Sequence, residues 1–149
     1  MHTCVAYLAG KIGGRSYAEV MAERKHAIGV LRGIGIHVLC PMRGKEPLHQ
    51  QMKLDGEETN IGFRNEELRA RDIADVLQAH ILIVLTGDTP SWGTGIEWGI
   101  AHYNNKPVFV IAKENAAAIE RGFCGACCAK AFPTIEKLAG YLRDTWLWI

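Results

Sequence analysis

A buried strand, a loop of small residues and the start of a helix follow one another between residues 80 and 101, and this succession constrains the fold most. The run His80-Ile-Leu-Ile-Val-Leu85 has the length and the β-branched content of a strand buried on both faces. A loop rich in Gly, Pro, Ser and Thr ends the strand, and the spacing of Ile96, Ile100 and Tyr103 then predicts a helix. This order is typical of a ligand-binding turn at the carboxyl edge of a parallel sheet.

Glu97 is the first candidate functional residue, because the pattern places it in the first turn of that helix. The free backbone N–H groups there, together with the positive end of the helix dipole, favour an ionised carboxylate. An ionised carboxylate beside a glycine-lined loop is a candidate nucleophile. The alternative is that Glu97 only complements the helix dipole, as glutamates in a first turn often do.

Strand and helix patterns alternate along the rest of the chain. We expect strands over residues 3–9, 34–40, 80–85, 108–112 and 131–132, and helices that include 16–33, 64–79 and 134–144. No linker or internal repeat interrupts them. The sequence therefore predicts an α/β fold over residues 1–149, as a single doubly wound, flavodoxin-like or Rossmann-like domain. Its parallel five-stranded sheet would be flanked by helices. The polar stretch 42–63 is long for a plain loop and is predicted to be a functional flap.

The bulk composition excludes several classes of partner. A net charge of +1 over 149 residues gives no electrostatic reason to expect a nucleic acid polymer or a membrane as partner. The first residues do not resemble a signal peptide, and no apolar run approaches the roughly 18 residues needed to span a bilayer. We therefore expect a cytoplasmic protein.

Five cysteines, an odd number, argue against a secreted disulfide framework. Three of them form the segment Cys124-Gly-Ala-Cys127-Cys128. A tetrahedral zinc site needs four ligands, and no second Cys or His pair at ligand spacing accompanies this segment, so no metal site is predicted. A redox role for the three thiols remains an open alternative.

Three polar clusters are expected to meet at the carboxyl ends of the first and third strands. They are Tyr7 with the loop that follows its strand, the pair Arg71-Asp72, and the central loop. In the loop Gly10-Lys11-Ile-Gly13-Gly-Arg15, glycines let backbone N–H groups approach a ligand and two cations add positive charge. This combination suits a phosphate or a carboxylate, and a tight turn with solvated cations is the alternative. The central loop contributes further polar groups and a glycine, at Asp88, Ser91, Gly93 and Thr94. Its hydroxyls can donate hydrogen bonds to an anion or a sugar.

Two members of these clusters have a role that spacing alone leaves open. Tyr7 lies within the first strand and can be a core residue or a site residue. Arg71-Asp72 falls in a helix rich in both charges, where a solvent-facing pair is the simpler interpretation.

Four motifs in order resemble the nucleoside 2-deoxyribosyltransferase superfamily, which includes hydrolases that cut the N-glycosidic bond of nucleoside 5′-monophosphates. They are Tyr7-Leu-Ala-Gly10, Arg71-Asp72 followed by Ala79-His-Ile-Leu-Ile-Val, Ser91-x-Gly-Thr-x-x-Glu97-x-Gly-x-Ala101, and Lys106-Pro107-Val108. The resemblance implies that Glu97 attacks the anomeric carbon and forms a covalent glycosyl-enzyme. It also implies that Asp72 assists the base as acid or proton relay, and that Tyr7 hydrogen-bonds Glu97.

The resemblance further implies that Met42 and Arg43, after the second strand, help to shape the base pocket. Six residues before the nucleophile, the transferases tend to carry an acidic residue and the monophosphate hydrolases a serine, which here is Ser91. A hydroxyl there does not repel a 5′-phosphate, and Lys11 and Arg15 would favour one.

We therefore expect cleavage of (deoxy)nucleoside 5′-monophosphates with release of the free base. A transferase that exchanges bases between deoxynucleosides is the alternative, and a non-catalytic nucleotide-binding protein is a second one. Neither a metal nor an organic cofactor is implied. Because relatives complete the pocket with a second subunit, a homodimer or higher homo-oligomer is expected. The apolar tail Trp146-Leu-Trp-Ile149 suits packing on the chain's own core or on that subunit.

Overall fold

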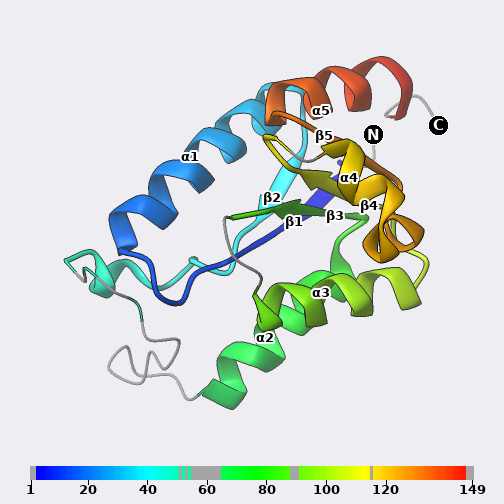
Figure 1. Cartoon of the computed structure of the whole chain (residues 1–149). Helices are drawn as coiled ribbons and strands as arrows, with labels where there is room; N and C mark the ends of the chain where they lie inside the picture. The colour runs from blue at the N-terminus through cyan, green and yellow to red at the C-terminus, as the bar shows by residue number, and fades with distance from the viewer. Residues whose placement is uncertain are drawn as a thin grey trace.

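Five parallel strands form one sheet between two layers of helices in the computed structural model, which describes residues 3–50, 52, 54, 65–87, 91–114 and 116–146 (Figure 1). The strands are β1 (Val5–Gly10), β2 (His37–Leu39), β3 (Ile81–Leu85), β4 (Val108–Ile111) and β5 (Lys130–Phe132). Their order is β2-β1-β3-β4-β5. This is the flavodoxin-like order, in which the chain reverses direction across the sheet between β1 and β3. The predicted doubly wound α/β fold is confirmed.

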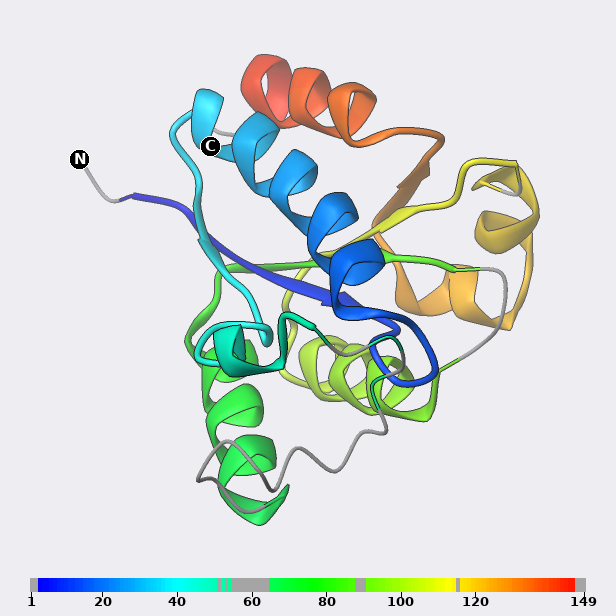
Figure 2. The same ribbon diagram turned by 90° about the vertical axis from the view of Figure 1, so that its left-hand side faces the viewer.

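The helices cover the two faces of the sheet in pairs. Helices α1 (Tyr17–Gly33) and α5 (Ile135–Tyr141) lie on one face, and α2 (Asn65–Gln78) and α3 (Trp92–Tyr103) lie on the other (Figures 1 and 2). Side chains alternate between the faces along each strand. Leu8 therefore packs in the core cluster below α1 and α5, whereas Tyr7 packs in the cluster below α2 and α3. Helix α4 (Ala116–Arg121) and the 3₁₀ helix η3 (Phe123–Cys127) pack together near β5.

Side chains cap α1, α3 and α5 at their amino ends, and the cap of α3 is described with the site. Ser16 and Glu19 form a reciprocal capping box on α1, and Thr134 accepts a hydrogen bond from the Lys137 backbone at the start of α5. Both caps were expected from the sequence. Within the part of the chain that the structure describes, no helix has the length and apolarity needed to cross a bilayer.

The second strand is shorter than predicted. The sequence suggested residues 34–40, but the regular strand covers only His37–Leu39. Ile34 is instead the C-cap of α1, and its backbone N–H bonds to the Leu31 carbonyl at 3.2 Å. Gly35 then adopts a φ of +83°, which turns the chain into the sheet.

The described residues of the polar stretch predicted as a flap contact the loop that follows β1. The stretch contains the short 3₁₀ helix η1 (Glu46–Leu48), and the buried Leu54 exchanges backbone hydrogen bonds with Gly14 and Arg15 at 2.7 and 2.8 Å. Residues 51, 53 and 55–63 of this stretch lie outside the described residues.

The carboxyl end of the chain packs on its own core as far as it is described. A π-helical turn, η4 (Leu142–Trp146), continues α5. The Trp146 ring meets the Phe109 ring edge-on, with centroids 6.0 Å apart and an interplanar angle of 86°. Residues 147–149 of the apolar tail lie outside the described residues.

Candidate active site

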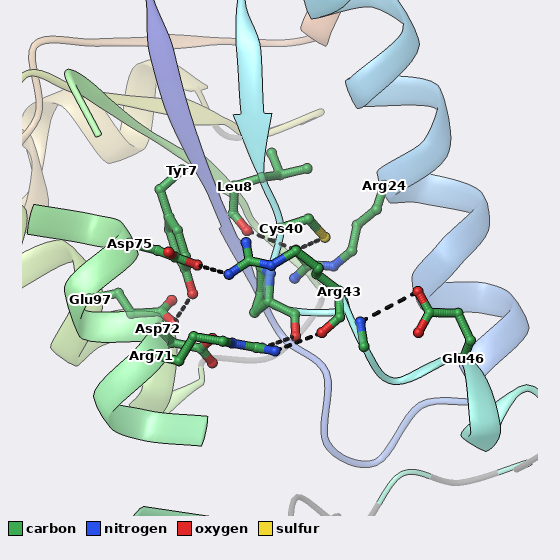
Figure 3. Close-up of polar contacts among 12 residues, drawn as sticks. Tyr7, Leu8, Arg24, Cys40, Arg43, Glu46, Arg71, Asp72, Asp75 and Glu97 are labelled. Carbon is green, nitrogen blue, oxygen red and sulfur yellow. Dashed lines mark hydrogen bonds and ion pairs between the residues drawn. The ribbon is translucent and has the colours of Figure 1, made fainter. Parts of the chain in front are cut away.

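Tyr7 and Glu97 meet at the carboxyl side of β1, beside the position where the strand order reverses. The Tyr7 hydroxyl donates a hydrogen bond of 2.7 Å to Glu97 Oε1 (Figure 3). Tyr7 is fully buried, and burial together with the Glu97 charge raises the pKa of its phenol, so Tyr7 remains a hydrogen-bond donor. The strand alternation explains the contact, because it directs Tyr7 toward α3. Tyr7 is thus both a core residue and a partner of the candidate nucleophile.

Glu97 is not in the first turn of its helix, as the sequence had suggested. Ser91 is the N-cap and α3 begins at Trp92, so Glu97 lies in the second turn. The sequence also predicted that the helix end favours the ionised form of Glu97, but the surroundings as a whole favour the protonated form. Burial raises the pKa of Glu97 to about 7, and the Asp72 charge adds to this rise. The hydrogen bond from Tyr7 works in the opposite direction.

Asp72 reaches the same pocket as Glu97 from α2 instead of facing solvent. A pocket of about 290 Å³ has both carboxyl residues in its lining, together with Gly93 and Ile96 of α3. Arg71 donates two hydrogen bonds to Asp72 Oδ1, of 3.1 Å from Nε and 2.9 Å from an Nη atom. Burial nevertheless raises the pKa of Asp72. The simpler interpretation of Arg71-Asp72 as a solvated pair is therefore wrong.

Lys45 lines this pocket as well, and the sequence analysis missed it. Lys45 is only 5% exposed, and the positive charge of its ammonium group lowers the pKa of both Asp72 and Glu97. The missed signal was positional: Lys45 follows β2 closely, and the ends of parallel strands nearest the reversal of strand order are where ligands bind.

Two arginines fasten the loop that carries Lys45 onto helix α2. Arg71 donates to the backbone carbonyls of Pro41 and Arg43 at 2.8 and 2.7 Å, and Arg43 forms an ion pair of 2.8 Å with Asp75 (Figure 3). The guanidinium of Arg71 thus joins the loop and the Asp72 carboxylate through one planar group.

Arg24 is a second buried cation that sequence reasoning missed. It is 1% exposed and donates to the Leu8 and Gly10 carbonyls at 2.8 and 2.9 Å, on the side of β1 opposite Tyr7. Its charge lowers the pKa of Glu97. The signal was available, since position 24 falls on the apolar face of α1 that begins at Tyr17 and Val20. A charged residue on such a face needs a buried partner.

A second pocket, of about 390 Å³, lies on the other side of the first turns of α3. Lys11, Ser91 and Thr94 contribute to its lining, together with Thr86 and Trp98. The Ser91 hydroxyl accepts a 3.4 Å hydrogen bond from the Thr94 backbone, which caps the helix. The Thr94 Oγ1 atom is buried and has no hydrogen-bond partner among the described residues. A buried hydroxyl of this kind can bond to a ligand in the pocket.

Three other predicted binding residues, Arg15, Met42 and Gly10, are not in the lining of either pocket. Arg15 forms an ion pair of 2.8 Å with Glu23, and Met42 is buried in a core cluster with Val20 and Leu48. Gly10 is tightly enclosed, because a Cβ there would lie 3.1 Å from the Leu85 carbonyl oxygen.

Around Gly13, by contrast, the space is open. Asp88 lies outside the described residues. The structure therefore brings Asp72 and Glu97 together at one pocket, with Tyr7 bonded to Glu97 behind it. Lys11, Ser91 and Thr94 lie at the other pocket.

Comparison with protein families gives one match. The family described as nucleoside 2-deoxyribosyltransferase matches residues 6–136 of the chain. A search of curated proteins finds no match.

Solved structures with a similar fold include three that cover nearly all of this chain. A 2-deoxyribosyltransferase from the psychrotolerant bacterium Bacillus psychrosaccharolyticus has a TM-score of 0.69 at 19% identity, over 93% of this chain and 92% of that one. The protein BlsM has a TM-score of 0.65 at 20% identity, over 95% and 87%. The CMP N-glycosidase BcmB of Clostridium botulinum has a TM-score of 0.57 at 18% identity, over 97% and 99%. At these identities the likeness establishes a shared fold.

Proposed function

The chain belongs to the nucleoside 2-deoxyribosyltransferase family, and on this premise we propose that it cleaves the N-glycosidic bond of nucleoside 5′-monophosphates. The observation that carries the proposal is the pair of half-buried carboxyl residues at one pocket, with Glu97 held by the Tyr7 hydroxyl at 2.7 Å. Two carboxyl groups, one as nucleophile and one as acid, are the arrangement by which retaining glycosidases work.

The reaction proceeds in two displacements. The Glu97 carboxylate attacks the anomeric carbon, the C–N bond breaks, and the base leaves with the bonding electrons and a proton delivered by way of Asp72. This forms a glycosyl ester on Glu97. Water then attacks the same carbon, gives up a proton toward Asp72, and releases the sugar phosphate and the Glu97 carboxylate. Burial raises the pKa of both groups, to about 7 for Glu97, and a raised pKa favours a carboxyl group that can carry and pass on a proton.

The two pockets suit the two ends of a nucleotide. The pocket with Lys11, Ser91 and the unpartnered Thr94 hydroxyl offers a cation, hydroxyl groups and the amino end of α3, all of which favour a phosphate. The pocket with Asp72 and Lys45 offers a proton and a buried cation, which suit the carbonyl and nitrogen acceptors of a nucleobase.

The first experiment measures free base by chromatography from deoxynucleosides, ribonucleosides and their 5′-monophosphates, with and without a second free base. We expect release from the monophosphates without an acceptor, and none from the Glu97→Gln variant. Formation of a new nucleoside only when an acceptor is present would make the protein a base-exchanging transferase. No release and no exchange by the wild type, with nucleotide binding intact, would make it a nucleotide-binding protein.

Ser91→Asp tests the phosphate end without removing the helix cap. Asp caps helices as well as Ser does, so stability should be retained, while the added carboxylate should repel a phosphate. We expect a rise in KM for monophosphates of about tenfold or more, as the loss of about 1.4 kcal/mol of binding gives. Thr134→Asp makes the same exchange at the N-cap of α5 and is the matched control. An unchanged KM in Ser91→Asp would place the phosphate elsewhere.

We also propose that the protein is a homodimer or a higher homo-oligomer. Helix α3 exposes three large apolar side chains, Trp92 at 93%, Ile96 at 59% and Tyr103 at 87%. Ile96 also lines the pocket of Glu97, so this face continues into the site. Light scattering on wild type and Trp92→Glu should show an oligomer that the substitution weakens. A wild-type monomer at working concentration would refute the proposal.

A cytoplasmic location is proposed as well. All five cysteines carry free thiols in the structure, which is the state expected in a reducing compartment.

A further inference from the structure

Three thiols gather on the short helix η3 and the residue after it, beside the larger pocket and outside the carboxyl pair. Cys124 and Cys127 lie within η3 (Phe123–Cys127), and Cys128 follows. In a 3₁₀ helix, side chains three residues apart project to the same side, and the rise of about 2 Å per residue separates their Cα atoms by about 6 Å. A disulfide accepts Cα separations of about 4.4–6.8 Å. The Cα separation of Cys124 and Cys127 therefore lies within the range of disulfides. A disulfide also brings its Cβ atoms to about 4 Å, so the turn must tighten when the bond forms.

The packing of η3 against α4 fixes this turn. A Cβ placed on Gly125, between the two cysteines, would lie 1.9 Å from the Glu120 carbonyl oxygen. Only glycine permits this backbone contact, so η3 is held closely on the end of α4. The Gly125 N–H also bonds to the Gly122 carbonyl at 2.9 Å, which closes the turn that contains Cys124.

The three thiols differ in accessibility. Cys124 is exposed, whereas Cys127 and Cys128 are half-buried. Burial and the neighbouring Glu120 raise the pKa of Cys128, which disfavours its thiolate form. A small disulfide in solution therefore meets Cys124 first, with Cys127 on the same side of the helix.

The thiol pair is also joined to the helix that carries Glu97. Trp98, the next residue after Glu97, donates its indole N–H to the Cys127 carbonyl at 2.7 Å. Cys124 and Trp98 both line the larger pocket, as do Lys11 and Ser91. A change at η3 is therefore adjacent to that pocket and reaches α3 through one hydrogen bond.

We propose that Cys124 and Cys127 form a reversible redox-active dithiol, a modification site on the wall of the larger pocket. The Cys124 thiolate attacks a low-molecular-weight disulfide such as oxidised glutathione, forms a mixed disulfide and releases one small thiol. The Cys127 thiolate then attacks the Cys124 sulfur, forms the protein disulfide and releases the second small thiol. Two protein thiols are oxidised and one small disulfide is reduced.

The test equilibrates the reduced full-length protein with mixtures of reduced and oxidised glutathione, followed by alkylation and mass spectrometry. Trypsin cleavage after Arg121 and Lys130 places all three thiols in one peptide. In the wild type we expect the Cys124–Cys127 disulfide with Cys128 alkylated, and full reversal by excess reduced glutathione. Cys128→Ser, the matched control in the same segment, should form the same disulfide.

Cys127→Ser should trap glutathione on Cys124, and Cys124→Ser should take up none in this peptide. Circular dichroism verifies that each variant is folded. Pairing that includes Cys128, or no pairing at any glutathione ratio, would overturn the proposal. A Cys127→Ser variant that traps no glutathione on Cys124 would overturn the assigned order of attack.

A second readout follows Trp98 and needs no enzymatic activity. Oxidation should change the tryptophan fluorescence of the wild type, and this change should be lost in Trp98→Phe, although the disulfide still forms. An equal change in both proteins would show that η3 and α3 are not coupled. These readouts stand whether or not the proposed base release is found.

Discussion

At the scale of single residues, the hydrogen bond between Tyr7 and Glu97 controls when Glu97 is ionised. The pKa of Glu97 is about 7, the result of burial that raises it and the Tyr7 hydroxyl that lowers it. A nucleophilic carboxylate must be deprotonated, so base release should increase as the pH rises through about 7.

Tyr7→Phe should therefore move the acidic limb of the pH–rate profile to higher pH, because the variant loses the donor that stabilises the charged form. A hydrogen bond to a charged group contributes about 1.5–3 kcal/mol, so the rate at neutral pH should fall about 10- to 100-fold. The profile of kcat against pH is the measurement. Tyr103→Phe, an exposed tyrosine on α3, is the control. An acidic limb that does not move in Tyr7→Phe would contradict this role.

Buried cations were the least predictable residues of the site. The motifs indicated Tyr7, Asp72 and Glu97. The structure places Asp72 and Glu97 at one pocket and bonds Tyr7 to Glu97. Arg24 and Lys45 were missed although their positions carried a signal, because a long cationic side chain on a helix or in a loop is usually solvated. Their burial depends on which carbonyls and carboxylates the fold brings near them.

At the scale of secondary structure elements, Arg71 connects helix α2 to the loop after β2. Its four hydrogen bonds go to Asp72 and to two loop carbonyls, those of Pro41 and Arg43. The loop holds Lys45 over the pocket, so this single guanidinium arranges both an acid and a cation of the site.

Arg71→Met should lower the free energy of unfolding by about 2 kcal/mol or more, because two carbonyls and a part-buried carboxylate lose a charged donor. It should also raise the pKa of Asp72 further and reduce base release. Chemical denaturation and the base-release assay measure the two effects. Arg143→Met is the control, since Arg143 pairs in the same way with the next residue, Asp144, but on the exposed surface. Equal losses of stability in the two variants would refute a special role for Arg71.

Helix α3 shows why the boundary of an element is harder to predict than its existence. Gly93 and Gly95 read as loop residues, because each costs about 1 kcal/mol relative to alanine inside a helix. The structure nevertheless begins the helix at Trp92 with the Ser91 cap. The two glycines leave both sides of these turns open, since Gly95 lines one pocket and Gly93 the other. The low helix propensity of glycine is therefore overridden here, and the missing side chains leave room for the two pockets.

At the scale of the whole molecule, the sheet was the most predictable feature. The length and β-branched content of apolar runs such as residues 81–85 indicated buried strands, and their alternation with helices left the doubly wound topology as the simplest solution. The ionisation of the site residues was harder to predict from the sequence. It depends on contacts between elements far apart in sequence, such as the hydrogen bond of Tyr7 with Glu97.

The raised pKa of Glu97 links the site to global stability. A carboxyl group whose folded pKa lies above its ordinary value of 4.5 contributes stability that is complete below pH 4.5 and is lost as the pH rises through about 7. Glu97→Gln keeps an acceptor for Tyr7 and removes this titration. The variant should match the wild type near pH 4.5 and be more stable at pH 8, by up to about 3 kcal/mol.

Denaturant unfolding of both proteins at pH 4.5 and pH 8 measures this difference. Glu136→Gln is the control with the opposite sign, because the hydrogen bonds of the exposed Glu136 lower its pKa. A gain in Glu97→Gln that is the same at both pH values would contradict the link.

The configuration of the product tests the proposed covalent Glu97 intermediate most directly. A nucleoside 5′-monophosphate is turned over in water containing methanol, and proton NMR follows the anomeric signal of the first methyl glycoside formed. Two displacements at the same carbon, the first by Glu97, predict retention of configuration. They also predict no methyl glycoside from the Glu97→Gln variant. An inverted product, or turnover that survives in Glu97→Gln, would show that water attacks the substrate directly and that Glu97 is not the nucleophile.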